Sequence, residues 1–364
     1  MLVSASMIVR DEAHHLVACL QSLAPIVDEI VVVDTGSRDA TREIALAHGA
    51  RLFDFTWCDD FSAARNYAIE CSRGDWILYI DADERLRPYP RETLAAELAD
   101  TALVASTLRF HPRTGYTAYP EYRLFRRDEK IRFSGPFHET MLPALVPLLA
   151  EGGRMGHSSL TIDHVGYDGD QSHKLERNRH MLSLALEGRP ERAYLWWHLG
   201  TVERDLGNAA AAEAAWRQGL HLAQQGRDMT GNVVLCVMEL AKAEAARGED
   251  SLPLLQEGLA LVPANWLLRW LEAGALRDRG DFTPAEAIFR ELAAQDPDRM
   301  IDHAAYDRRI FGAGAWAELG YCAFLRQDYA TSAACYGEAE RREPRSLEYR
   351  AKRILSQARA GKAL

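Results

Sequence analysis

The chain of 364 residues has no long apolar run, no closely paired cysteines and no excess of basic residues. A membrane-spanning helix needs about 18–20 consecutive apolar residues, and the best candidate, Met141 to Ala150, contains two prolines. The uncharged stretch from Met1 to Val9 lacks the basic start of a secretion signal. We therefore expect neither a signal peptide nor a transmembrane segment.

The cysteines are too sparse for a disulfide framework, and none of them forms a CxxC pair. The six are Cys19, Cys58, Cys71, Cys236, Cys322 and Cys335. We expect buried or half-buried thiols in a reducing compartment, and hence a cytoplasmic protein.

Basic residues are outnumbered, with 43 Lys and Arg against 53 Asp and Glu and a net charge of −10. Binding nucleic acid over a large surface needs a basic footprint, so we expect no nucleic-acid partner. A hydrophobic share of 48% excludes a mostly disordered chain. The length corresponds to two domains of ordinary size, roughly 100–200 residues each.

Short apolar runs alternate with helical patterns in the first half of the chain. The runs cover 2–9, 29–33, 51–55 and 76–80, and the helical patterns cover 15–23, 41–48 and 62–72. This alternation predicts an α/β domain with a mostly parallel sheet and helices on both of its faces. Ligands bind beyond the carboxyl ends of such strands, where Asp34 and Asp81 lie.

From about residue 175 the chain is rich in Ala, Leu and Arg and has helical periodicity throughout. Two segments match the tetratricopeptide pattern: Trp196, Leu199, Gly200, Ala212 and Trp216, then Trp316, Leu319, Gly320, Tyr336, Ala339 and Pro344. Two degenerate units between them end one repeat length apart, at Pro263 and Pro297. We predict an α/β domain over 1–172, a connecting helix over 173–189 and an all-α repeat domain over 190–364. An unrelated helical bundle is the alternative.

The strongest chemical signal is Asp81-Ala82-Asp83-Glu84, directly after the run 76–80. In an extended segment, residues i and i+2 point the same way, so the two Asp carboxylates would converge. Hard divalent cations favour such oxygen ligands. The pair therefore indicates a magnesium or manganese ion that bridges to a diphosphate, although acid pairs also occur in surface loops by chance.

Two further segments carry candidate binding residues. Asp34 could accept hydrogen bonds from a base or a ribose, and Asp39 is better explained as a cap of the helix that follows it. Arg65 could pair with phosphate oxygens or form a salt bridge to a neighbouring acid. The basic stretch Arg123, Arg126, Arg127, Lys130 and Arg132 is either an acceptor- or phosphate-facing surface or, more commonly, a solvated charged hairpin.

Taken together, these segments resemble the family 2 inverting glycosyltransferases, which have a GT-A fold. The similarity is to the branch of lipopolysaccharide core β-glucosyltransferases and bacteriocin S-glycosyltransferases, several of which carry a helical repeat tail. The matching stretches are 7–12, 28–37, 61–66, 74–78, 138–139 and 164–167. The resemblance covers about residues 3–180. One departure is Asp11, where the family usually has Asn.

The resemblance implies a hexosyltransferase-type enzyme that uses a nucleoside-diphosphate sugar, most often UDP-linked, and a divalent metal ion, Mn²⁺ or Mg²⁺. By position, the nucleotide would be bound by Ile8, Arg10, Glu12, Asp34, Arg65 and Asp81. Asp81 and Asp83 would hold the metal. His164 would complete the metal or diphosphate site, or would instead be hydrogen-bonded inside the fold.

Inversion is a single in-line displacement that needs one general base on the acceptor side. Glu139 is the candidate base, because family members place the base after the metal motif. Its alternative is a loop acid without a catalytic role, and Asp83 and Glu84 are rivals for the base.

We expect the acceptor to be a hydroxyl or thiol, and a peptide or protein, a glycan and a small molecule all stay open as its source. The repeats would bind the acceptor or a partner, or would join two subunits in a homodimer. The competing hypothesis is an adaptor that binds sugar nucleotides without catalysis. A sugar-1-phosphate nucleotidyltransferase is disfavoured, because residues 7–12 contain no glycine for a phosphate loop.

Overall fold

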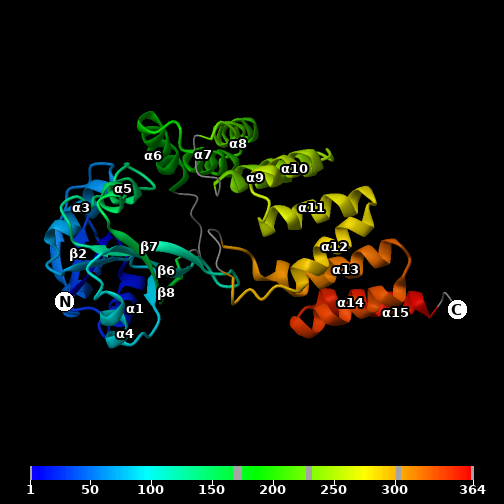
Figure 1. Cartoon of the computed structure of the whole chain (residues 1–364), viewed down its shortest axis with the longest axis horizontal. Coiled ribbons are helices and arrows are strands. Elements are labelled where there is room, and N and C mark those ends of the chain that lie inside the picture. The colour runs from blue at the N-terminus through cyan, green and yellow to red at the C-terminus, as the bar shows by residue number, and fades with distance from the viewer. Residues whose placement is uncertain (1, 167–173, 227–231, 301–304, 362–364) are drawn as a thin grey trace. The chain divides into compact units, whose positions relative to one another are not determined.

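The computed structural model describes residues 2–166, 174–226, 232–300 and 305–361. The chain divides into two compact units (Figure 1). The first contains the residues up to Thr114 and Ala118–Pro190, and the second contains Gly115–Thr117 and most of the chain from Glu191 onward. None of the described helices is long and apolar enough to cross a membrane.

The first unit is built on one eight-stranded sheet in the order β3-β2-β1-β4-β7-β6-β8-β5. The strands are β1 (Val3–Val9), β2 (Glu29–Asp34), β3 (Arg51–Asp54), β4 (Trp76–Tyr79), β5 (Glu84–Leu86), β6 (Leu103–His111), β7 (Tyr119–Arg126) and β8 (Arg154–His164). Strands β3, β2, β1 and β4 are parallel, as predicted. Strand β7 runs antiparallel between β4 and β6, so the other half of the sheet is mixed.

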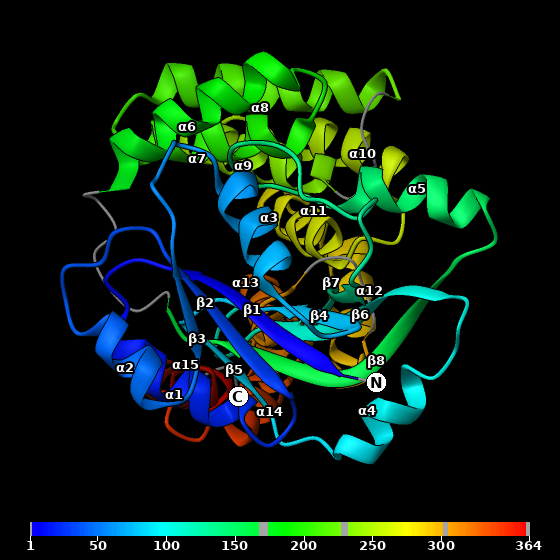
Figure 2. The ribbon, with the colours of Figure 1, turned by 90° about the vertical axis from the view of Figure 1, so that its left-hand side faces the viewer.

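Helices cover both faces of this sheet, as Figure 2 shows. On one face lie α1 (Ala13–Leu23), α2 (Thr41–Ala47) and α4 (Arg91–Glu97), and on the other lie α3 (Phe61–Cys71) and α5 (Leu142–Ala150). Alternate side chains of a strand point to opposite faces. Accordingly, Val32 packs in the α1 and α2 core, whereas Val31 and Val33 pack against Ala68 of α3. The helices and strands predicted in this half are confirmed to within two residues at each end.

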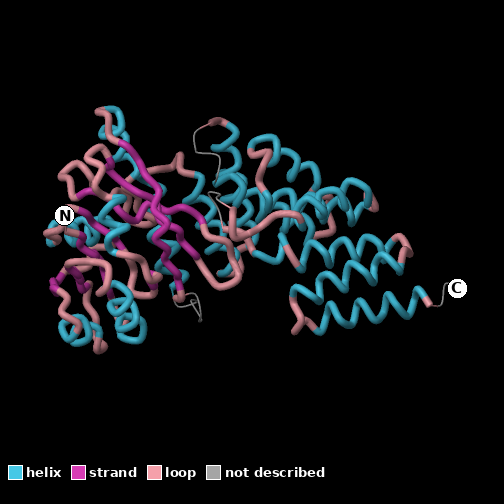
Figure 3. Tube along the Cα trace, turned by 60° about the horizontal axis from the view of Figure 1, so that its bottom comes forward, coloured by secondary structure: helices cyan, strands magenta, loops and turns pink. Residues whose placement is uncertain are grey.

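The second unit is a series of helical hairpins, drawn in cyan in Figure 3. Its helices are α7 (Ala193–Asp205), α8 (Ala209–Gln224), α9 (Val233–Ala246), α10 (Leu252–Leu261), α11 (Trp266–Arg279), α12 (Phe282–Ala293), α13 (Ala313–Leu325), α14 (Tyr329–Arg342) and α15 (Leu347–Ala360). The 3₁₀ helix η3 (Arg308–Phe311) precedes α13. Both clear repeat units and both degenerate ones fall on consecutive helix pairs, which confirms the tetratricopeptide-like repeats. Helix α6 (Leu175–Gly188) belongs to the first unit.

A glycine on the first helix of a hairpin packs against an aromatic ring on the second. A Cβ atom at Gly200 of α7 would overlap the indole of Trp216 on α8. A Cβ atom at Gly320 of α13 would likewise lie 3.1 Å from the ring of Tyr336 on α14. The Trp216 indole N–H also donates to the carbonyl of Trp197 at 3.1 Å, which fixes the ring in this position.

We expect Gly200→Ala to destabilise the protein by about 1–3 kcal/mol, because the methyl group overpacks the contact with Trp216. Gly274 of α11 is the matched control, since a Cβ atom there meets no atom within 4 Å. Gly274→Ala should stabilise by up to about 1 kcal/mol, because Ala favours helix more than Gly does. Urea midpoints followed by circular dichroism test this, and equal shifts in both variants would contradict the packing described.

None of the six cysteines, all of which lie in the described part of the chain, forms a disulfide. Cys19, Cys236, Cys322 and Cys335 are buried, and Cys71 is half-buried. Cys58 is exposed, contrary to the expectation that all six thiols would be at least partly buried.

Candidate active site

The acidic segment after β4 forms a turn. The N–H of Glu84 donates to the carbonyl of Asp81 at 3.1 Å, and the N–H of Asp81 donates to the Glu84 side chain at 2.9 Å. The segment is therefore a turn and not the extended stretch expected from the sequence, while the convergence of the two Asp side chains stays a prediction. Asp81 and Asp83 contact different partners, Arg65 and His164.

Asp81 lies between two arginines. Its Oδ1 accepts a hydrogen bond from Arg65 Nη2 at 2.9 Å, and its Oδ2 lies 3.9 Å from Arg123 Nη1. Burial would raise the pKa of Asp81, but Arg65 and Arg123 outweigh that effect and hold the pKa below its ordinary value. The side chain keeps 34% of its surface exposed, so the ionised carboxylate can still meet a ligand.

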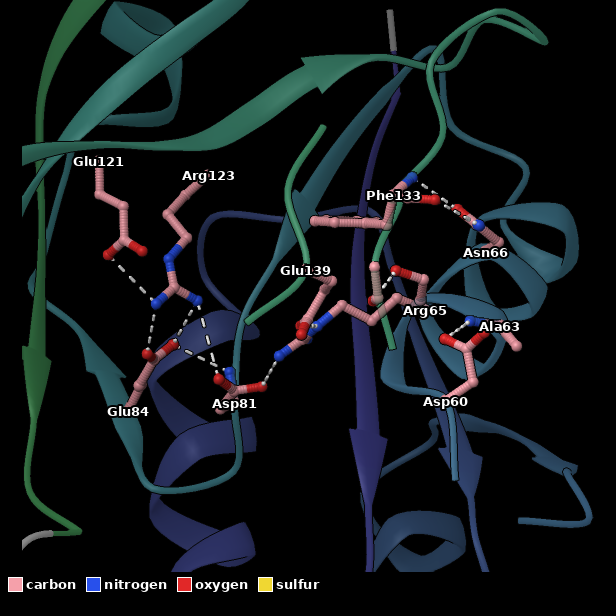
Figure 4. Close-up of polar contacts among 12 residues, drawn as sticks. Asp60, Ala63, Arg65, Asn66, Asp81, Glu84, Glu121, Arg123, Phe133 and Glu139 are labelled. Atoms are coloured by element: carbon pink, nitrogen blue, oxygen red, sulfur yellow. Dashed lines mark hydrogen bonds and ion pairs between the residues drawn. The ribbon is translucent and has the colours of Figure 1, made fainter. Parts of the chain in front are cut away.

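Arg65 joins Asp81 to Glu139 (Figure 4). Its Nε donates to Glu139 Oε1 at 2.5 Å, and its guanidinium lies 5.0 Å from the centre of the Tyr79 ring. Only 9% of Arg65 is exposed. Of the two interpretations of this residue, the salt bridge to neighbouring acids is therefore the one present, and direct contact with a diphosphate stays a prediction.

Helix α3 holds the loop that carries Glu139. Asn66 makes two hydrogen bonds to the backbone of Phe133, at 3.0 and 2.8 Å, and the Ser62 hydroxyl donates to the carbonyl of Gly135 at 2.6 Å. Residues three and four positions apart share one face of a helix. This spacing explains why Ser62, Arg65 and Asn66 can all bind the same loop.

Arg123 of β7 is buried, with 5% of its surface exposed. Its Nη2 lies 2.9 Å from Glu84 and 3.2 Å from Glu121, and its guanidinium lies over the rings of Tyr79 and Phe110. Neither a solvated hairpin nor a phosphate-facing surface describes this residue, so both interpretations were wrong for it. The signal in the sequence was a basic residue within an apolar strand, two positions after an acid.

The other basic residues of this stretch do not form one surface either. Arg126 stacks on Trp76 and donates to backbone carbonyls, and Lys130 forms an exposed pair with Glu151.

His164 contacts Asp83, the second acid of the motif. The distance from Nε2 to Asp83 Oδ2 is 3.0 Å, and Nδ1 lies 3.1 Å from the carbonyl of Pro112. Burial lowers the pKa of His164, but Asp83 outweighs burial and the net shift is upward. A Cβ atom at Gly166 would overlap the Asp83 carboxylate, so a glycine is needed there. Tyr167, which completes this motif, lies outside the described residues.

The charges around the motif fit a divalent cation. The pKa of Glu12 is raised to about 7, first by burial and then by repulsion from Asp83, with a smaller contribution from Asp81. Such crowded acids are what a hard cation stabilises. In the described part of the chain, the group with three ligand atoms within 4.8 Å of one another is Glu12, His14 and His15. Asp81, Asp83 and His164 do not meet as a closed trio, and their role at a metal stays a prediction.

The remaining predicted nucleotide-binding residues lie near the carboxyl ends of β1 and β2. Ile8 is half-buried and Arg10 is exposed. Asp34 is only 3% exposed, and it accepts hydrogen bonds from Arg42 at 3.0 Å and from the backbone of Ser37 at 3.2 Å. These contacts occupy Asp34 within its own turn, so a bond to the base or the ribose stays a prediction.

Asp11 and Asp39 shape the backbone beside this pocket. Asp39 accepts hydrogen bonds from the N–H groups of Ala13 and Thr41, both at 3.0 Å, although the N-cap position of α2 is Ala40 and not Asp39 as expected. Asp11 has a φ of 56°. Asn and Asp tolerate this left-handed region better than other side chains do, which accounts for the exchange of Asn for Asp here.

Two basic residues at the start of α6 were missed. The charge of Lys174 lowers the pKa of Glu12. The pKa of Arg177 is lowered first by burial and then by repulsion from Arg10, so these two arginines lie near each other. Lys174 and Arg177 therefore bring positive charge to the side of the sheet where the candidate nucleotide residues lie. They fall in a stretch that the sequence indicated only as a connecting helix.

The sheet order, the acidic turn after β4 and the helical hairpins define a GT-A-type α/β domain followed by tetratricopeptide-like repeats. Residues 4–161 match the family described as glycosyl transferase family 2. A TPR repeat-containing protein of Synechococcus elongatus is 37% identical over 310 residues, which are 81% of this chain and 76% of that protein. The chain belongs to glycosyl transferase family 2, and it is a glycosyltransferase.

More distant relatives match over shorter segments. An uncharacterized glycosyltransferase of Rickettsia felis is 33% identical over 139 residues, which are 38% of this chain and 45% of that protein. The prophage-derived glycosyltransferase SunS of Bacillus subtilis is 27% identical over 205 residues, which are 51% of this chain and 44% of that protein. The chain thus spans less than half of the length of these two relatives.

Among solved structures, glucosyl-3-phosphoglycerate synthase of Mycobacterium tuberculosis is 17% identical, with a TM-score of 0.38. The match covers 50% of this chain and 80% of that chain. Mannosyl-3-phosphoglycerate synthase of Rubrobacter xylanophilus is 18% identical, with a TM-score of 0.39, over 52% of this chain and 74% of that chain. At these values the likeness carries no weight for the donor or the metal.

Glu12→Gln should raise the melting temperature by a few degrees at pH 8 without divalent cations, and should not raise it at pH 5. Because the pKa of Glu12 is raised from 4.5 to about 7 in the folded protein, its ionisation costs stability as the pH rises through 7. Gln removes that charge. Exposed Glu43 on α2 provides the control, Glu43→Gln, for which we expect no pH-dependent gain. An equal gain in melting temperature at both pH values would show that the ionisation of Glu12 does not destabilise the folded protein.

Proposed function

We propose that this protein transfers a sugar from a nucleoside-diphosphate sugar, most simply a UDP-sugar, to an acceptor hydroxyl or thiol, with inversion and with a divalent metal ion. The observation that carries the proposal is the chain of contacts from Asp81 through Arg65 to Glu139, beside Asp83 and His164. Membership of family 2 supports the sugar-nucleotide donor, and UDP is the commonest nucleotide in that family.

The donor diphosphate would lie beyond the carboxyl ends of β1, β2 and β4. We infer that Asp83 and Oδ2 of Asp81 hold the Mn²⁺ or Mg²⁺ ion, and that His164 orients Asp83. A bound cation would neutralise the charge that develops on the leaving diphosphate. Arg10 and Arg177 would offset further phosphate charge, and the base and ribose would lie towards Ile8 and Asp34.

Glu139 is the proposed general base. In this role its carboxylate accepts the proton of the acceptor hydroxyl or thiol while the acceptor attacks the anomeric carbon. Arg65 and the backbone contacts of Asn66 hold the Glu139 loop in place, and such fixed orientation is what proton transfer in one step requires. Its side chain is only 12% exposed, so the acceptor must approach closely.

The repeats are proposed to bind the acceptor, with a polypeptide as the favoured class. A pocket of about 280 Å³ lies among α11, η3, α13 and α15 within the second unit. Trp270, Tyr321 and Tyr349 line it together with charged side chains such as Arg309 and Glu318. Aromatic and charged groups of this kind suit a peptide side chain. Self-association through the repeats is the competing use of this unit.

A cytoplasmic location is also proposed, and the free thiols of the six cysteines support it.

The direct test is nucleotide release from UDP-, GDP- and TDP-linked sugars with Mn²⁺, with Mg²⁺ and with a chelator. We expect slow hydrolysis of one UDP-sugar that needs a divalent cation and stops when the cation is removed. A chain that binds UDP without releasing it from any sugar would favour the adaptor hypothesis. A chain that neither binds UDP nor hydrolyses a donor would contradict the proposed function.

The same assay tests the proposed base with Glu139→Gln. Loss of the base should lower the transfer rate by about 10²–10⁴-fold, while the affinity for UDP stays within about twofold to threefold. Glu151→Gln, an exposed acid paired with Lys130, is the control and should behave as the wild type. Unchanged turnover in the Glu139 variant would remove this residue from the mechanism.

A further inference from the structure

Glu84 and Arg123 form a buried ion pair next to Asp81. Glu84 is 1% exposed and Arg123 is 5% exposed. The two guanidinium nitrogens lie 2.9 and 3.3 Å from the two carboxylate oxygens of Glu84. The rings of Tyr79 and Phe110 lie 4.3 and 4.9 Å from the guanidinium carbon, so Arg123 has little room to move.

The two oxygens of Asp81 are used differently. Arg65 binds Oδ1 at hydrogen-bond distance, whereas Arg123 lies 3.9 Å from Oδ2, too far for a hydrogen bond. Within the described residues, no hydrogen bond reaches Oδ2. Oδ1 of Asp81 is therefore bound to Arg65, and Oδ2 is open to a ligand although the buried Arg123 lies next to it.

The position of Glu84 accounts for this difference. Both of its oxygens accept hydrogen bonds from N–H groups, including the backbone N–H of Asp81 at 2.9 Å. Burial raises the pKa of Glu84 to about 8, and the charge of Arg123 opposes that rise. The hydrogen bonds favour the ionised form, because an ionised carboxylate satisfies all of these donors, whereas a protonated one would turn an O–H towards an N–H. The negative charge of Glu84 thus faces Arg123 at closer range than that of Asp81 does.

We propose that Glu84 is a positioning residue that takes up the charge of Arg123 and so keeps Oδ2 of Asp81 available to the cation and diphosphate of the donor. The inference rests on the proposed function, because it concerns the same site. It assigns a positioning role to two buried residues, the acidic Glu84 and the basic Arg123.

The consequence is a competition that a single substitution would reveal. Glu84→Gln keeps the shape of the side chain and an oxygen for the Asp81 N–H, but removes the charge opposite Arg123. Arg123 should then pair with Oδ2 of Asp81 and compete with the cation. We expect the affinity for UDP in the presence of Mn²⁺ to fall about tenfold or more, measured by calorimetry, with a larger change in donor KM than in kcat.

Two further variants separate this role from a purely structural one. Adding Arg123→Met to Glu84→Gln removes the competing cation, so the double variant should recover most of the lost UDP affinity. Glu84→Asp keeps the charge and should bind UDP more tightly than Glu84→Gln, even if it melts at a lower temperature. Arg126→Lys is the matched control on the same strand, since Arg126 contacts Trp76 and backbone carbonyls and not Asp81.

The outcomes are distinct. Wild-type affinity in Glu84→Gln, or no recovery in the folded double variant, would overturn the inference while leaving the proposed function intact. If Glu84→Gln does not fold, the comparison of Glu84→Asp with the wild type decides, and a loss of tenfold or more in that variant counts against the inference. Failure of the wild type to bind UDP with any divalent cation would overturn both the inference and the proposed function.

Discussion

A single buried guanidinium, that of Arg65, links the two carboxylates on which the proposed chemistry depends. Asp81 follows β4 and Glu139 lies on a loop far along the chain, and Arg65 binds both from α3. Breaking a buried ion pair by removing one partner typically costs about 3–5 kcal/mol. The relative position of the donor-side acid and the acceptor-side acid therefore depends on this arginine and on the helix face that carries it.

Arg65 also belongs to a larger cluster of charged side chains around Asp81. Two buried cations, Arg65 and Arg123, are surrounded by four acids, Asp81, Glu84, Glu121 and Glu139. The acids exceed the cations, and nearby Glu12 has its pKa raised to about 7 by burial first and then by repulsion from Asp83. A divalent cation would stabilise a site of this kind, so the proposed metal requirement and the arrangement of the buried pairs would have the same cause.

Local pattern was enough to predict much of this molecule. The parallel strands and their helices follow from period-two and period-3.6 patterns over short windows, and the repeats follow from glycine and aromatic residues at fixed spacing. The pairing of Glu84 with Arg123 could not be predicted in this way, because it depends on β7 lying antiparallel beside β4. The turn at residues 81–84 was missed because Glu84 closes it with its own side chain.

The central claim is that Asp81 divides its two oxygens between Arg65 and the donor. A crystal structure of the protein with UDP and Mn²⁺ tests it most directly. The account predicts Mn²⁺ bound by Asp83 and by Oδ2 of Asp81, with Arg65 still hydrogen-bonded to Oδ1 and to Glu139. A structure in which Oδ2 pairs with Arg123, or in which the ion is held instead by Glu12, His14 and His15, would contradict it.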